Sequence, residues 1–386
     1  MKLLIKGGKI FDAIHKEPYV ADILAVDGKI TAIGENLDST DAEIVDATGL
    51  NVYPGLVEAH GHIGLDGWAM GYEGSDYNEY TDPVTPQLRA IDGINPFDES
   101  LHDAALGGVT TVCTGPGSSN VLGGTFAAFK TVGKCIDDMC VLPEAAMKCA
   151  FGENPKRCYR DKSITSRMST AAKLRDILFR AREYQRKVDL AGDDESKLPA
   201  FNLQLHAMLP VMRGQIPLKA HAHQANDILT AVRIAKEFGV KLTLEHVTDG
   251  ALIVDELARA NVPLAVGPTF GQPSKIELKN KSWQTPGILN KAGCHVSIIT
   301  DSPVTEQRHL RFCAAMAING GMDPFEAFRA VTLYPAEHIG IANRVGSIEV
   351  GKDADFALMD GDLFALATRV VAAFVGGVRV EGEKRD

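Results

Sequence analysis

Residues 51–70 read NVYPGLVEAHGHIGLDGWAM, and this stretch decides the fold because His60 and His62 close the apolar run that follows Pro54 and Gly55. Alternate residues of a β-strand point to the same face, so both imidazoles project from one side of the strand. Two neighbouring imidazoles are half of a metal site, although histidines also serve as hydrogen-bonded core or surface groups. The rest of the chain decides between these interpretations.

Three later apolar runs also end in residues that ligate metals. LKAHAH ends in His221 and His223, LTLEH ends in His246, and VSIITD ends in Asp301. The 25 residues from His221 to His246 match one strand–helix unit, and the 55 residues from His246 to Asp301 match two. In an eight-stranded barrel, the carboxyl ends of the strands collect the catalytic side chains at one face. The sequence therefore predicts a metal site built from four strand ends.

The middle of the chain, residues 56–345, alternates apolar strands with amphipathic helices. Such alternation predicts an α/β fold with parallel strands, and about 290 residues of it match a (β/α)8 TIM barrel with insertions. A doubly wound open sheet is the alternative, but no GxGxxG motif follows a first strand.

Residues 1–55 and 346–386 read as short strands punctuated by Gly and Asp-Gly turns. Each piece is too short to bury a sheet face by itself. We therefore expect a small β-sandwich domain formed from both termini, beside a TIM barrel over residues 56–345.

Two segments interrupt the strand–helix rhythm. Residues 64–100 lack apolar periodicity and carry eight acidic residues, so we expect a functional loop over the site, although such a run is also typical of a solvated surface. Residues 163–200 show Leu174, Ile177, Leu178, Ala181 and Tyr184 at helical spacing, which predicts an inserted helix without a catalytic role.

The sequence resembles the amidohydrolase superfamily of metal-dependent hydrolases. The matching pieces are GLVEAHGH, KAHAH, LEH, TDSP and the closing stretch EAFRAVTLYPAEHIGIANRVGSIEVGKDADFAL, and together they cover nearly the whole chain. The resemblance implies a (β/α)8 barrel with a small β-sandwich and a metal-dependent hydrolase, which agrees with the organisation above. It also implies a homo-oligomer that acts on a small molecule.

Carried over by position, the resemblance makes His60 and His62 ligands of one metal. His221 and His246 become ligands of a second metal or contacts of the substrate, and Asp301 becomes the metal-bound acid and base. His223 stands where related imidazolonepropionase-like enzymes have an acidic residue, so direct ligation and contact with the substrate both remain open.

The bridging ligand of two-metal members is a carboxylated lysine or a glutamate. The stretch VLPEAAMKCAFGENPKR supplies Lys148, Glu144 and Glu153, and we favour Lys148 because it follows a short apolar run. Burial beside metals depresses a lysine pKa enough for carbamate formation. The alternative is that Lys148 is an exposed or salt-bridged lysine without this role. Without a bridge, His60, His62, His221 and Asp301 would hold a single metal and His246 would contact the substrate.

The ligand set of imidazoles and a carboxylate suits Zn first, with Fe, Mn or Ni as alternatives, and can acidify water for hydrolysis. We expect cleavage of a C–N bond in a cyclic amide or an amino-acid-derived amide. A dipeptidase for Xaa-Pro or N-acyl amino acids is the second interpretation. A deaminase ranks third, because His223 and Gln224 replace the acidic residue of such members, and the complete ligand set opposes a non-catalytic barrel scaffold.

The composition limits partners and location. The 386 residues are 45% hydrophobic with a net charge of -10, which argues against nucleic-acid binding. No stretch resembles a signal peptide or approaches the roughly 20 apolar residues of a membrane span, so we expect a cytoplasmic protein. The seven cysteines form no CxxC pair, which disfavours disulfides. Arg157, Arg160 and Arg213 are candidates to bind a substrate carboxylate.

Overall fold

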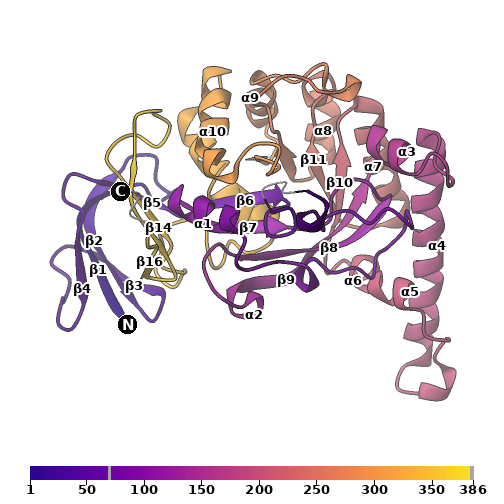
Figure 1. Ribbon diagram of the computed structural model, residues 1–386, viewed down its shortest axis with the longest axis horizontal. Helices are drawn as coiled ribbons and strands as arrows, with labels where there is room; N and C mark the ends of the chain where they lie inside the picture. The colour runs from indigo at the N-terminus through magenta and orange to yellow at the C-terminus, as the bar shows by residue number, and fades with distance from the viewer. Residues whose placement is uncertain (68–70, 383–386) are drawn as a thin grey trace.

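Two eight-stranded sheets organise the chain, whose structure is a computed structural model that describes residues 1–67 and 71–382. The larger body lies on one side of Figure 1 and the sheet built from the two ends of the chain lies on the other. The last three residues of the stretch at 51–70 and the last four of the predicted terminal domain lie outside the described residues.

The barrel sheet runs in chain order from one edge to the other. Its strands are β6 (Leu56–Gly61), β7 (Val109–Thr114), β8 (Leu122–Lys130), β9 (Cys140–Ala150), β10 (Leu218–Ala222), β11 (Leu242–His246), β12 (Leu264–Val266) and β13 (Val296–Ile298). The edge strands β6 and β13 do not pair directly. Instead, Val57 N–H donates to the Val331 carbonyl and Ile298 N–H to the Ala330 carbonyl, so residues 330–331 bridge the seam.

The prediction of uniformly parallel strands is wrong at β8, which runs antiparallel to both β7 and β9. The connections explain this difference, because residues 115–121 and 131–139 are too short for the crossover of a dozen or more residues that parallel neighbours need. The other barrel pairs, from β9 to β13 and between β6 and β7, are parallel as predicted.

Helices cover the outside of the barrel. The longer ones are α1 (Glu99–Leu106), α4 (Arg167–Ala191), α7 (Ala225–Phe238), α8 (Val254–Ala260), α9 (Gln284–Lys291) and α10 (Leu310–Asn319). The shorter ones are α2 (Ile136–Met139), α3 (Glu153–Cys158), α5 (Leu203–Ala207), α6 (Leu209–Met212), α11 (Pro324–Arg329) and α12 (Leu333–His338). None of the helices in the described ranges is long and apolar enough to cross a membrane.

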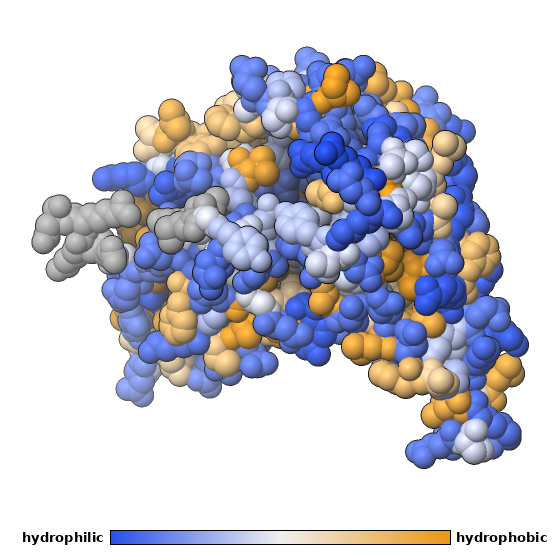
Figure 2. Space-filling view, turned by 45° about the vertical axis from the view of Figure 1, so that its right-hand side comes forward, coloured by the Kyte–Doolittle hydropathy of each residue, from blue (hydrophilic) through white to orange (hydrophobic). Residues whose placement is uncertain are grey.

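The inserted helix predicted over 163–200 is α4, which starts at a capping box formed by Ser166 and Ser169. All five residues predicted at helical spacing are buried. The C-terminal end of α4 projects beyond the rest of the molecule in Figure 1, and apolar side chains appear among polar ones at this tip in Figure 2. The exposed apolar residues of this region are Leu190, Leu198, Phe201 and Leu203.

The second sheet unites the two ends of the chain. Its strands are β1 (Lys2–Ile10), β2 (Tyr19–Val26), β3 (Lys29–Gly34), β4 (Glu43–Asp46), β5 (Asn51–Pro54), β14 (Phe356–Met359), β15 (Val370–Val375) and β16 (Val378–Arg379). The central pairing is β5 with β14, where Val52 lies opposite Leu358. Because β5 runs almost directly into β6, this sheet fixes where the first barrel strand begins.

Candidate metal centre

The carboxyl ends of β6 and β13 bring together His60, His62 and Asp301, all of which were predicted from the sequence. The Oδ1 atom of Asp301 lies 3.3 Å from His62 Nε2 and 3.6 Å from His60 Nε2. His62 Nδ1–H donates to the Gly115 carbonyl at 2.8 Å, which leaves Nε2 with a free lone pair on the side of Asp301. These three groups are therefore oriented as ligands.

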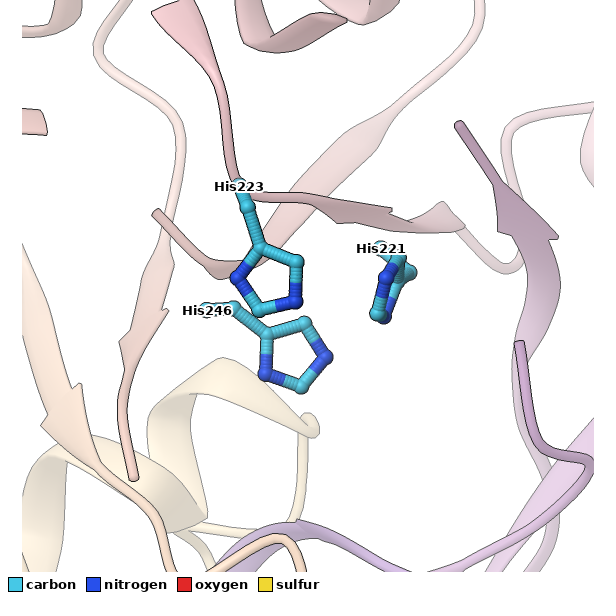
Figure 3. Close-up of side chains that lie close together, drawn as sticks. All are labelled: His221, His223 and His246. Carbon is cyan, nitrogen blue, oxygen red and sulfur yellow. The ribbon is translucent and has the colours of Figure 1, made fainter. Parts of the chain in front are cut away.

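A second group lies next to the first and consists of His221, His223 and His246 from the ends of β10 and β11. Their ring centroids are 4.4 to 4.7 Å apart, and Figure 3 shows ring nitrogens of all three turned toward a common space. His246 Nδ1–H donates to the Gly267 carbonyl at 2.9 Å, and His223 Nδ1 lies 2.8 Å from Thr248 Oγ1. The structure therefore groups His223 with the two predicted strand-end ligands.

The chain bends sharply where two of these groups leave their strands. His246 has a φ of 74° and Asp301 a φ of 51°, both in the left-handed region that non-glycine residues rarely adopt. Such backbone costs on the order of 1–3 kcal/mol per residue and is concentrated at functional sites. The bend at His246 lets Glu245 and His246, although adjacent in sequence, both contact groups inside the barrel.

Lys148 on β9 lies next to the first group. Its side chain is fully buried, and its Nζ is 3.1 Å from His60 Nε2. Burial lowers the pKa of Lys148 to about 8, which favours the neutral amine. Glu144 faces a pocket at the opposite end of the barrel with Gln215 and Lys241.

Glu153, the other candidate for the bridge, begins α3, and its backbone N–H donates to Glu277. Within the described ranges its carboxylate makes no hydrogen bond or ion pair with the histidines. Lys148 is therefore the candidate that the fold brings next to the ligands.

Burial sets the protonation of the site. It lowers the pKa of His60, His221 and His223 well below the ordinary histidine value, so these rings are neutral. Burial would raise the pKa of Asp301, but His246, His62 and His60 hold it well below the ordinary carboxyl value. Neutral imidazoles and an ionised carboxylate are the forms that bind a cation.

Several buried polar atoms that face the site have no hydrogen-bond partner among the described residues: both nitrogens of His221, His246 Nε2 and Asp301 Oδ1. Buried polar atoms are normally satisfied, so this many together require an explanation. A bound cation explains most of them, and the residues present therefore fit a metal.

The segment after His62 contributes an aromatic ring and few charges to the site. The Tyr77 ring lies 5.1 Å from the His62 ring. Of the eight acidic residues expected near the site, five are exposed to solvent: Glu73, Asp76, Asp82, Asp92 and Glu99. Most of these acidic residues thus belong to a solvated surface. Tyr77 was not predicted to lie near the site, because no sequence pattern distinguishes it.

The three arginines considered for a substrate carboxylate are exposed. Arg160 pairs with Asp161 and Arg213 with Asp189. A different charged pair lies next to the histidines: Glu277 Oε1 is 3.9 Å from His223 Nε2 and 2.6 Å from Lys275 Nζ. Sequence patterns did not predict this pair, because it lies in the long connection between β12 and α9, outside any predicted strand or helix.

Comparison with known proteins assigns the family. The sequence profile of the amidohydrolase family matches residues 51–380, which include every residue of both groups of candidate ligands. The chain belongs to the amidohydrolase family. The resemblance seen in its sequence is therefore confirmed.

Solved structures agree with this assignment. The amidohydrolase from Thermotoga maritima MSB8 is 39% identical, has a TM-score of 0.95 and aligns over 98% of this chain and 99% of its own. A Xaa-Pro dipeptidase with bound methionine aligns over 99% of this chain with a TM-score of 0.58 and 17% identity, which shows the shared fold alone.

Curated relatives are more distant in sequence. The amidohydrolase tasK of Hapsidospora irregularis is 27% identical over 93% of this chain, but the chain spans only 40% of the length of that relative. A dihydroorotase of Pelotomaculum thermopropionicum is 24% identical over 94% of this chain and 90% of its own length.

Proposed function

We propose that this amidohydrolase is a metal-dependent hydrolase that cleaves a C–N bond in a cyclic amide or an amino-acid-derived amide. One observation carries the proposal: two groups of three ligand-type side chains, five of them buried and Asp301 partly exposed, meet at the carboxyl ends of the barrel strands. Buried neutral imidazoles without partners have a high cost in free energy unless a cation or substrate satisfies them.

His60, His62 and Asp301 would hold one divalent cation, and His221, His246 and His223 would hold a second. Lys148, as a carbamate, would provide a ligand to each of the two cations. Imidazole and carboxylate ligands favour Zn, with Fe, Mn or Ni next, over Ca or Mg. A cation bound there supplies Lewis acidity, which lowers the pKa of water and polarises a carbonyl group.

Asp301 would move the protons. Its carboxylate, ionised and 3.3 Å from His62 Nε2, is placed to accept a proton from the attacking water. It would then transfer this proton to the leaving nitrogen. In a site that holds a single cation, the Nε2–H of His223 would donate to the developing oxyanion. His246 would contact the substrate through the lone pair of Nε2, because its Nδ1–H is donated to the Gly267 carbonyl.

The names of relatives support a ring amide as substrate. Several are called dihydroorotase, and a segment of 65 residues is 48% identical to a D-hydantoinase of Geobacillus stearothermophilus. Adenine deaminases also match over most of the chain, at 22% and 23% identity. His223 stands against a deaminase, because members of that kind carry an acidic residue near this strand end.

The test is a paired measurement of metal and activity. The purified chain is assayed for bound metals, and a panel of cyclic amides, N-acyl amino acids, Xaa-Pro dipeptides and aminopurines is screened with added Zn or Mn. We expect one to two cations per chain and turnover of a cyclic amide that a chelator abolishes. Less than about one cation per five chains after purification without chelator would contradict the proposal.

A further inference from the structure

Beneath the two ligand groups lies a buried cluster of charged and ionisable side chains that the proposed reaction does not use. It consists of Glu245, Lys219 and His338, whose exposed fractions are 0%, 1% and 5%. They come from β11, β10 and α12, so three separate elements converge on one point inside the barrel. Fully buried lysine and glutamate side chains are rare unless they are paired.

The contacts of the cluster are short and specific. Glu245 Oε2 lies 3.0 Å from Lys219 Nζ, and His338 Nε2 lies 3.2 Å from Glu245 Oε1. Lys219 Nζ and His338 Nε2 are 3.3 Å apart. The ammonium group of Lys219 therefore compensates the negative charge of Glu245, and His338 occupies the other carboxylate oxygen.

Glu245 also contacts a residue of the candidate metal centre. Its Oε2 lies 3.2 Å from His60 Nδ1, while the other nitrogen of that ring, Nε2, faces Lys148 Nζ and Asp301 Oδ1. His60 thus has one nitrogen on the metal side and the other against a buried carboxylate.

The other anchored histidines of the site differ in this respect. His62 and His246 each hold their second nitrogen against a backbone carbonyl, Gly115 and Gly267 respectively. A carboxylate is a stronger acceptor than a carbonyl, and a charged acceptor raises the basicity of the ring as a ligand. Of His60, His62 and His246, only His60 has a carboxylate next to its second nitrogen.

We propose that Glu245 is the positioning residue for His60. Its carboxylate accepts the Nδ1–H of that ring, fixes the tautomer and directs the Nε2 lone pair to the cation beside Asp301. Lys219 holds this carboxylate in place through its contact with Oε2, the same oxygen that faces His60. This inference rests on the proposed metal site and assigns to Glu245 the role of holding the ligand His60 in position.

A purely structural role predicts different results. If Glu245 only neutralised Lys219, any change that keeps this charge pair would leave metal binding unchanged. If Glu245 positions His60, a shorter carboxylate would keep the negative charge for Lys219 and still lose the contact with the ring. Glu245→Asp separates the two roles, because the contact with His60 is already at 3.2 Å.

The experiment is a competition titration of the full-length protein with Zn²⁺ against a chromophoric chelator. For Glu245→Asp we expect an affinity for the tighter-bound Zn²⁺ that is about 10-fold to 100-fold weaker than in the unmodified chain. The matched control is His338→Gln, which alters the other carboxylate oxygen without touching His60, and should stay within about threefold. Equal affinity of Glu245→Asp and the unmodified chain would overturn the inference, as would an equal loss in His338→Gln.

A second measurement needs no change at Glu245 and applies even if that variant does not fold. ¹⁵N NMR of the unmodified chain labelled at histidine, with the His60 signals assigned by His60→Gln, reports which ring nitrogen carries the proton. We expect Nδ1–H with unprotonated Nε2 in the zinc-loaded protein, and protonation at Nε2 would overturn the inference. Failure of the unmodified chain to bind Zn²⁺ would instead contradict the proposed function.

Discussion

At the scale of single residues, burial and neighbouring side chains together set which groups of the candidate centre are neutral and which are charged. His60 and His221 are fully enclosed and therefore uncharged, whereas Asp301 stays ionised because the surrounding imidazoles outweigh its burial. The left-handed backbone at His246 and Asp301 turns side chains into the barrel at positions where a regular strand would alternate. The protonation of the candidate ligands thus follows from their surroundings inside the barrel, and the orientation of His246 and Asp301 follows from the bent backbone.

Asp301→Asn tests the proton transfer. The amide keeps the size of the side chain but cannot accept a proton, so kcat should fall by a factor of roughly 10²–10⁴ while the fold is retained. Steady-state kinetics on the substrate found in the panel and circular dichroism measure the two effects. Asp193→Asn, at an exposed position, is the control, and near-normal kcat in Asp301→Asn would remove Asp301 from this role.

Lys148→Met tests the bridging group. Methionine fills a similar volume without an amine, so the chain should bind one cation in place of two and lose most of its activity. In the unmodified chain exposed to ¹³C-labelled bicarbonate, ¹³C NMR should show a carbamate signal that Lys148→Met lacks. The same spectrum for both proteins, with equal metal content, would rule out a carbamate on Lys148.

At the scale of elements, the segment after β6 is held in place by one buried carboxylate. Asp98 caps α1 by accepting the Ser100 N–H at 2.9 Å through Oδ1, and it accepts the Gly64 N–H at 2.9 Å through Oδ2. Gly64 has a φ of 85°, so the chain turns there directly after His62. The start of α1 and the turn behind a candidate ligand therefore share one anchor.

Asp98→Ala removes both hydrogen bonds. We expect a loss of about 2 kcal/mol in the free energy of unfolding, because a helix cap is lost and the Gly64 N–H is left buried without its acceptor. Limited proteolysis should then cut within residues 64–98 faster than in the unmodified chain. Asp76→Ala, in the same segment but exposed, is the control, and equal cleavage rates in both variants would contradict a role of Asp98 as anchor.

At the scale of the whole molecule, an ion cluster joins the barrel to the sheet built from the termini. Lys130 at the end of β8 lies 2.9 Å from Asp353 and also pairs with Asp355, and Lys29 of β3 pairs with Asp353 from the other side. Burial would raise the pKa of Asp353, but Lys130 and Lys29 hold it below the ordinary value of 3.8. The two bodies are thus joined by charge as well as by chain connections.

Asp353→Asn tests this junction and its pH dependence. At neutral pH we expect a loss of about 3 kcal/mol in the free energy of unfolding, because Lys130 loses one of its two buried partners. A carboxylate with a lowered folded pKa stabilises above its unfolded pKa and loses this contribution as the pH falls through the folded pKa. Denaturant unfolding should show the difference between the two proteins shrinking below pH 3.8, and a difference that is constant with pH would contradict this origin.

The sequence by itself determined the strand ends that carry the candidate ligands, and it placed both ends of the chain together in one small β-domain. The ligand positions are His60, His62, His221, His246 and Asp301. These features follow from local patterns: residue alternation, the length of strand–helix units and turn residues. The limits of the terminal domain and the role of each ligand remain predictions.

Only the tertiary structure decided the antiparallel direction of β8, the inclusion of His223 in the second group and the contacts of Glu245. Glu245 meets His338 across 93 residues of chain, and Lys148 meets His60 across 88. Such contacts leave no local pattern, because the partners are selected by packing inside a closed barrel. The sequence LTLEH places Glu245 directly before the candidate ligand His246. That the Glu245 side chain also points into the barrel follows only from the backbone bend at His246, which the structure shows.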